Sequence, residues 1–189
     1  MKRFEYSKIE KERFDALAIE ILDMAKKDQE LRLSGNEKDN EDAEWRQEYR
    51  NLDATNTKRL KEIIGEIGWP VISKVGEEAS HAAWLLVQHA RDENLNIDIG
   101  FQKQALELMK EAQEGDVDKS NIAYLEDRIL ISQDKHQLYG TQQELKDGKW
   151  TPMQTADIEK VNERRKEMGM PPVEEATEKL NESPKSSLK

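Results

Sequence analysis

The chain has 189 residues, with 30 Lys and Arg against 40 Asp and Glu, so its formal net charge is −10. Hydrophobic residues make up 35% of it and charged residues 37%, but the apolar residues are periodic, which favours a folded domain over a disordered chain. The absence of a basic stripe argues against a nucleic-acid partner, the absence of cysteine excludes thiolate chemistry, and no apolar run approaches the roughly 20 residues needed to span a bilayer.

The N-terminal part of the chain is predicted to be helical. Apolar residues recur at helical spacing from about Tyr6 to Leu33, and Ser34-Gly35-Asn36 ends this first helix. The acidic run 37–42 is predicted to be a solvated loop. A short helix over 44–51 follows, in which Trp45 and Tyr49 share one face because they are four residues apart.

The middle of the chain is predicted to contain the core helix. Asp53 is expected to cap a helix that Gly68-Trp69-Pro70 ends, since glycine suits the position after a helix and proline cannot continue one. The next helix, from a Ser73 cap to about Arg91, is apolar around most of its circumference. We therefore expect it to be central and buried.

The C-terminal part contains shorter helices and one interruption. Helices are predicted over about 99–113 and 119–133. Between 138 and 152, glycines and a proline break the helical pattern, and the Asp147-Gly148 pair between short runs indicates a hairpin or an irregular loop. A last helix is expected over about 155–168, before a flexible tail over 181–189.

These elements predict a mainly α fold. We expect a single-domain helical bundle, residues 1–180, around a central apolar helix, with a small irregular or β-hairpin segment near 138–152. The basic N-terminal residues are not followed by an apolar stretch, so no signal peptide is expected. The protein is predicted to be cytoplasmic, with no membrane partner.

Ionisable residues on the apolar central helix are the first indication of a site. Glu78 and His89 are placed within about 20° of each other around the helix axis, about three turns apart. An unpaired buried charge is costly, so the pair needs partners. Two interpretations remain open: a structural network satisfies the pair, or the pair faces an opening lined by other segments.

Other segments supply further polar groups. Asp127 and Arg128 lie on the predicted helix 119–133. Tyr139, Thr141 and Gln142 follow in the irregular segment, where a neighbouring glycine permits a close backbone approach. With the imidazole, these residues offer a base, an acid, a guanidinium, an amide and two hydroxyls.

Several of these residues belong to motifs that resemble an uncharacterised bacterial family of unknown function. The resemblance spans roughly residues 15 to 178 and implies a small, mostly helical domain, with no particular activity. Its motif blocks are rich in polar residues, which favours the interpretation that Glu78 and His89 face an opening lined by other segments. The motifs are Gly68-Trp69-Pro70, Ala82-Ala83-Trp84-Leu85-Leu86-Val87-Gln88-His89-Ala90, Tyr124-Leu125-Glu126-Asp127-Arg128-Ile129 and Tyr139-Gly140-Thr141-Gln142, with similar patterns at Asp28-Gln29-Glu30-Leu31-Arg32, 147–152, 161–165 and 169–172.

His89 is the best candidate for acid–base chemistry, because imidazole is the side chain best suited to proton transfer near neutral pH. Asp127 and Glu78 are predicted to orient it, and these three form the candidate catalytic set. The candidate ligand-binding residues are Gln88, Arg128, Tyr139, Thr141 and Gln142.

No metal site is assigned from the sequence. His81 and His89 are too far apart to act as an i,i+4 pair, and Glu78 with His81 is a single copy of the i,i+3 pair that helical carboxylate sites use twice. Family members often carry a short polar or small residue at the position of His81, so it is not counted as a site residue. No cofactor class is indicated, since nucleophile elbows and Gly-rich phosphate loops are missing from the sequence.

The leading interpretation is a polar pocket centred on His89 that binds a small molecule and can carry catalysis. The alternative is a protein-interaction or inhibitor module, whose acidic surface contacts a basic partner and whose polar residues form a structural network. Replacing His89 or Gln142 with alanine separates the two, because only a buried network should lose several kcal/mol of stability.

Overall fold

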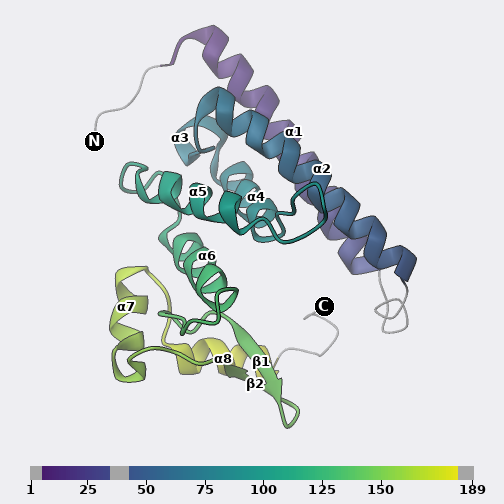
Figure 1. Ribbon diagram of the computed structural model, residues 1–189. Coiled ribbons are helices and arrows are strands. Elements are labelled where there is room, and N and C mark those ends of the chain that lie inside the picture. The colour runs from purple at the N-terminus through teal and green to yellow at the C-terminus, as the bar shows by residue number, and fades with distance from the viewer. Residues whose placement is uncertain (1–5, 35–42, 183–189) are drawn as a thin grey trace. The chain divides into compact units, whose positions relative to one another are not determined.

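The computed structural model describes residues 6–34 and 43–182, most of which are helical (Figure 1). The predicted mainly α fold is confirmed. By its internal contacts the chain divides into two compact units, residues 1–117 and 118–189, which are described in turn. The single domain over 1–180 stays a prediction. Within the described ranges, each helix is too short or too polar to cross a lipid bilayer.

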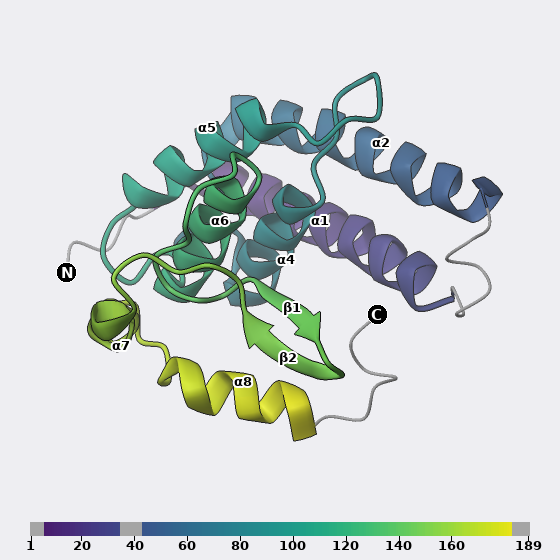
Figure 2. The same ribbon diagram turned by 60° about the horizontal axis from the view of Figure 1, so that its bottom comes forward.

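Two long antiparallel helices form one side of the first unit. Helices α1 (Lys8–Ser34) and α2 (Ala43–Ile67) lie side by side in both views (Figures 1 and 2). Their facing apolar residues, such as Ile21 on α1 and Leu60 on α2, are fully buried. Helix α1 begins and ends close to its predicted bounds, but the predicted loop 37–42 lies outside the described residues.

Helix α2 corrects the prediction of two helices in this region. It continues without a break through Asp53, which was predicted to cap a second helix. No glycine or proline interrupts the chain there, and the Asp53 carboxylate accepts hydrogen bonds from arginine side chains instead of a backbone N–H. The predicted pairing of Trp45 with Tyr49 is confirmed by a ring-centroid distance of 5.0 Å.

The central helix is confirmed but is shorter than predicted. Gly76, at φ +83°, separates a short helix α3 (Ile72–Val75) from α4 (Glu77–Gln88). His89 caps the end of α4 with its N–H donating to the Leu86 carbonyl at 3.2 Å, so the helix ends before Arg91. Helix α4 buries most of its surface against α1, α2 and α5 (Ile99–Lys110), as its apolar composition predicted.

The second unit begins with helix α6 (Lys119–Ile131), which Asp118 caps by accepting from the Ser120 N–H at 2.8 Å. A hairpin follows, formed by β1 (Gln143–Lys146) and β2 (Lys149–Pro152). Asp147 and Gly148 both have positive φ, 51° and 77°, as a two-residue hairpin turn requires. The hairpin predicted near 138–152 is therefore confirmed.

The C-terminal helices differ from the prediction. A 3₁₀ turn η2 (Ile158–Lys160) and helix α7 (Val161–Glu167) replace the single helix expected over 155–168. Helix α8 (Val173–Glu182) was not predicted; it starts directly after Pro171-Pro172, because proline is tolerated where a helix begins. The first two residues of the predicted tail belong to α8, and 183–189 lie outside the described residues.

Candidate functional site

Five charged or titratable side chains meet in the first unit, and we call them the charged cluster. Its members are Asp28 and Arg32 on α1, Asp53 on α2, and His89 and Arg91 at the end of α4. Both carboxylates are buried, whereas the imidazole and the two guanidiniums are partly exposed. The cluster therefore lies at the edge of the core, with its cationic groups toward solvent.

The arginines pair with the two buried carboxylates. Arg32 donates from Nε to Asp28 Oδ1 at 3.0 Å and from Nη2 to Asp53 Oδ1 at 2.5 Å, so one guanidinium joins α1 to α2. Arg91 donates from Nε to Asp53 Oδ2 at 3.2 Å and from Nη1 to the Leu95 carbonyl at 2.8 Å. Such charge-assisted hydrogen bonds are stronger than neutral ones and fix the side-chain geometry.

Neighbouring residues on α2 hold the two arginines in place. The Tyr49 ring makes a cation–π contact with each of them, at 5.2 Å from the Arg32 guanidinium and 5.8 Å from that of Arg91. Thr57 donates its hydroxyl proton to the Asp53 backbone carbonyl at 2.7 Å and accepts from the Arg91 N–H at 2.9 Å. The positions of the guanidiniums are thus set by an aromatic face and by the backbone.

His89 is held by Asp28. The distance from its Nδ1 to the two carboxylate oxygens is 3.0 and 3.2 Å. An ionised carboxylate only accepts hydrogen bonds, so Nδ1 carries the proton in this pair. The other ring nitrogen, Nε2, has no hydrogen-bond partner among the described residues, and the side chain is 21% exposed. A neutral His89 consequently presents a free lone pair at Nε2.

The two carboxylates differ in their pKa values. Burial by itself would raise the pKa of Asp28, but the hydrogen bond and charge of His89, the Arg32 charge and the Gln29 amide together lower it to about 2. For Asp53, burial is the largest influence and the nearby Asp28 charge adds to it, so its pKa is raised despite Arg32. Asp28 is therefore the ionised carboxylate that accepts the hydrogen bond of the imidazole.

The same groups are the candidates for holding a metal ion. Ligand atoms of Asp28, Asp53 and His89 lie within 4.8 Å of one another. Both carboxylates are already paired with guanidiniums, so a divalent cation between them would face two positive charges at short range. The chemistry of the cluster suits an anion at its exposed edge better than a cation between its carboxylates.

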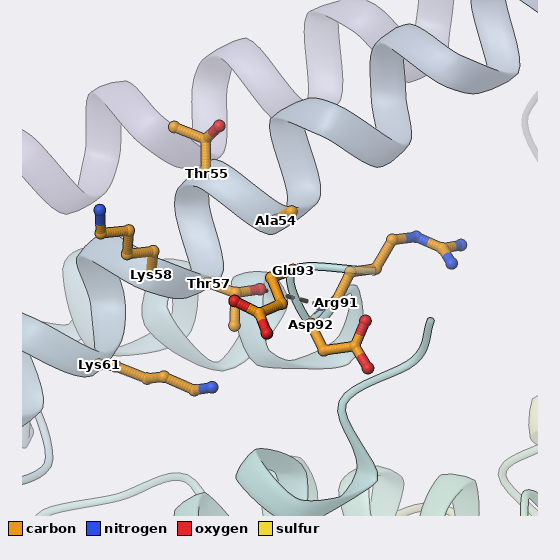
Figure 3. Close-up of a pocket in the computed structure, with 8 residues that line it drawn as sticks. All are labelled: Ala54, Thr55, Thr57, Lys58, Lys61, Arg91, Asp92 and Glu93. Atoms are coloured by element: carbon orange, nitrogen blue, oxygen red, sulfur yellow. Dashed lines mark hydrogen bonds between the residues drawn. The ribbon is translucent and has the colours of Figure 1, made fainter. Parts of the chain in front are cut away.

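A cavity of about 650 Å³ adjoins the charged cluster. It shares Arg91 with the cluster, its lining also includes Thr57, and Figure 3 shows the Arg91 guanidinium pointing away from the other lining side chains. Both signs of charge line this cavity, from Lys58 and Lys61 on α2 to Asp92 and Glu93 beyond Arg91. Arg91 therefore belongs to both features: it lines the cavity, and its guanidinium pairs with Asp53 in the cluster.

The second unit brings four of the predicted site residues together, and they are Asp127, Tyr139, Thr141 and Gln142. The buried Asp127 carboxylate accepts from the backbone N–H groups of Leu138, Tyr139 and Thr141 at 2.6 to 3.2 Å, and from the Thr141 hydroxyl at 2.9 Å. Gln142 Nε2 donates to Thr141 Oγ1 at 3.1 Å. Burial raises the pKa of Asp127, and the hydrogen bonds only partly offset this. Asp127 thus organises the 138–142 segment.

The remaining predicted site residues, and the hydroxyl of Tyr139, occupy different surroundings. Glu78 lies exposed in the first turn of α4, and Gln88 is buried at the end of this helix. Arg128 is half-buried on α6. The Tyr139 hydroxyl donates to Glu126 at 3.3 Å, and burial, together with the Glu126 charge, raises its pKa to about 12. The functional roles of these residues stay predictions.

One comparison with known proteins identifies the chain. The model of a family of unknown function, DUF6624, matches residues 15–188. The chain belongs to this family. The family resemblance drawn from the sequence motifs is therefore confirmed, and the match includes both the charged cluster and the Asp127 segment. No curated protein and no solved structure matches the chain.

In this DUF6624 protein, sequence analysis located His89 but missed most of its surroundings. Asp28 and Arg32 appeared only within one of the family motif patterns, and Asp53 was assigned to a helix cap. One available signal was the spacing of Asp28 and Arg32, an i,i+4 acidic–basic pair on the apolar face of α1. Arg91, directly after the central helix, carried no such signal.

Proposed function

We propose that the charged cluster binds a small anionic molecule, and that His89 exchanges a proton with this ligand through Nε2. The observation that supports the proposal best is the Asp28–His89 hydrogen bond, which leaves Nε2 without a partner in the described structure and partly exposed. A buried carboxylate that orients an imidazole in this way stabilises the imidazolium formed when His89 takes up a proton.

The charges of the cluster support an anionic ligand. Two carboxylates balance two guanidiniums, so protonation of His89 leaves one net positive charge at the exposed edge. Arg32 Nη1 and Arg91 Nη2 make no hydrogen bond within the described residues. These N–H groups are therefore available to a carboxylate or phosphate oxygen, for which guanidiniums are well suited.

Of the residues whose roles were inferred from the sequence, only some take part in this proposal. His89 keeps its predicted place as the proton-exchanging group, and Asp28 is the carboxylate that orients it. The orienting roles of Glu78 and Asp127, and the ligand contacts of Gln88, Arg128, Tyr139, Thr141 and Gln142, stay predictions. The predicted cytoplasmic location also remains part of the proposal, since small anionic metabolites are abundant there.

Native mass spectrometry of the protein as purified tests the proposal. We expect an extra mass of a small anionic molecule that is lost on denaturation and in the variants His89→Gln and Arg32→Gln. It should persist in His81→Gln, which changes an exposed histidine outside the cluster. An extra mass equal to a divalent metal ion, lost in the same variants, would contradict an anionic ligand.

Imidazole NMR gives a second, independent measurement. The chain has three histidines, so each ¹⁵N-coupled ring signal can be assigned by substitution. Neutral His89 should be protonated at Nδ1, and titration with acetate or inorganic phosphate should shift its Nε2 signal while leaving that of His136 in place. An Nε2-protonated ring, or no shift with either anion, would refute the role of His89 and favour a structural network.

A further inference from the structure

A second cavity, of about 300 Å³, lies entirely within the second unit. It is formed where the 138–142 segment, the end of α7 and helix α8 meet, and it does not involve the charged cluster of the first unit. Its lining includes Gly140, Thr141, Arg165, Ala176 and Lys179. The cavity therefore combines a tight backbone segment with a buried guanidinium and a more exposed ammonium group.

Arg165 is the unusual member of this lining. It is only 1% exposed, yet it forms no ion pair with a carboxylate among the described residues. Nε donates to the Pro171 carbonyl at 2.6 Å and Nη1 to the Tyr139 carbonyl at 2.7 Å. Nη2 has no hydrogen-bond partner in the described structure. A buried charge normally requires an oppositely charged partner, so one half of this guanidinium lacks its complement.

The surroundings of Arg165 compensate only weakly for the burial of its positive charge. Burial lowers the pKa of Arg165, while the more distant charges of Asp127 and Glu174 act in the opposite direction. The Asp127 carboxylate itself is fully engaged with the 138–141 segment. No carboxylate of the described chain is thus placed to accept from Nη2.

Gly140 shapes the wall beside this guanidinium. Its φ of +66° is in the left-handed region, and a Cβ at this position would lie 2.8 Å from Val173 Cγ2. Only glycine allows the chain to pass this close to α8. This approach positions the Tyr139 carbonyl that holds Nη1 and, on the other side, Thr141 in the cavity wall.

We propose that this cavity binds the carboxylate group of a small molecule, which accepts a hydrogen bond from Arg165 Nη2. A monoanion matches the single unpaired guanidinium. A dianion such as phosphate would bring excess negative charge next to Asp127 and Glu174, which already act on Arg165. The volume of the cavity accommodates a molecule of a few carbon atoms in addition to the carboxylate.

Titration of the full-length protein with acetate, propionate and inorganic phosphate, followed by ¹H–¹⁵N NMR, tests this site. Acetate and propionate should shift the Thr141 amide and the Arg165 Nε–H signals saturably. Arg165→Gln removes the charged donor and should weaken binding about tenfold or more. Ala176→Leu fills the cavity while leaving Arg165 unchanged and should weaken binding to a similar extent.

Lys166→Gln is the matched control, because it removes an exposed positive charge from the neighbouring position of α7. This variant should bind as the wild type does. The proposal is overturned if neither carboxylate produces saturable shifts, if phosphate binds more tightly than both, or if folded Ala176→Leu binds them unchanged. Since the signals of His89 and of Thr141 are read separately, failure here is distinguishable from failure of the proposed function.

Discussion

Asp28 gives the protein a specific dependence on acid. Its pKa in the folded protein is about 2, against an ordinary value of 3.8, so the unfolded chain takes up this proton at higher pH than the folded one. The contribution of ionised Asp28 to the stability of the folded protein is complete above about pH 4 and is lost as the pH falls toward 2. The interval between the two pKa values corresponds to about 2 kcal/mol.

Urea unfolding of the wild type and of Asp28→Asn, from pH 6 down to pH 2, measures this contribution. We expect the difference between their unfolding free energies to shrink by about 2 kcal/mol as the pH falls from about 4 to 2. Asp15→Asn, an exposed position on the same helix, should give a small difference at all pH values. A difference for Asp28→Asn that stays constant over this range would contradict the assigned pKa.

Two glycines with similar backbone angles should respond differently to alanine. Gly140→Ala adds a Cβ that lies 2.8 Å from Val173 Cγ2, whereas the Cβ in Gly148→Ala has no neighbour within 4 Å. Both variants suffer from a positive φ, which costs about 1 to 2 kcal/mol. Gly140→Ala should lose roughly 2 kcal/mol more because of the clash. Thermal unfolding measures the stability of both variants. Equal losses of stability would show that α8 moves to make room for the added methyl group.

At the scale of elements, Asp127 connects helix α6 to the segment before the hairpin. Asp127→Ala leaves three partly buried backbone N–H groups without their acceptor, and we expect a loss of about 3 to 5 kcal/mol. Asp127→Asn retains one acceptor oxygen and should lose less. Chemical denaturation measures both variants. A loss below about 1 kcal/mol for the alanine variant would mean that this segment is ordered by other contacts.

The helices and the hairpin show how much of the secondary structure local sequence patterns can predict. Periodicity predicted α1, α5 and α6 well, and Asp147-Gly148 predicted the hairpin turn. The break expected at Asp53 was wrong because its carboxylate is satisfied by Arg32 and Arg91, which lie far from it in sequence. A local cap signal cannot be distinguished from a tertiary ion pair without knowing which helices are neighbours. Helix α8 was not predicted, although the preceding Pro171-Pro172 is compatible with the start of a helix.

At the scale of the whole molecule, the division into two compact units predicts separable responses. Asp127→Ala should accelerate amide hydrogen exchange in residues 118–182 and leave exchange around His89 and Asp28 near that of the wild type. Mass-spectrometric hydrogen exchange of the full chain measures both regions at once. Equal acceleration in both would show that the protein opens as one cooperative body.

The candidate site was less predictable than the fold for a related reason. His89 was found because an imidazole on a predicted apolar helix is conspicuous in sequence. Its partners come from α1 and α2, and periodicity assigns each residue to a helix face without identifying the opposite helix. Arg165 was not among the predicted site residues, although its side chain is buried. Such assignments depend on tertiary packing.

The contacts of the Tyr49 ring have an optical consequence. The Arg32 and Arg91 guanidiniums lie 5.2 and 5.8 Å from the centre of this ring, and the Trp45 indole meets it edge-to-face at a centroid distance of 5.0 Å. The indole N–H also donates to the Leu31 carbonyl at 3.2 Å, which holds the fluorophore against α1. An anion that draws either arginine away from Tyr49 should therefore alter the emission of Trp45, which makes this emission an expected readout of the proposed anion site.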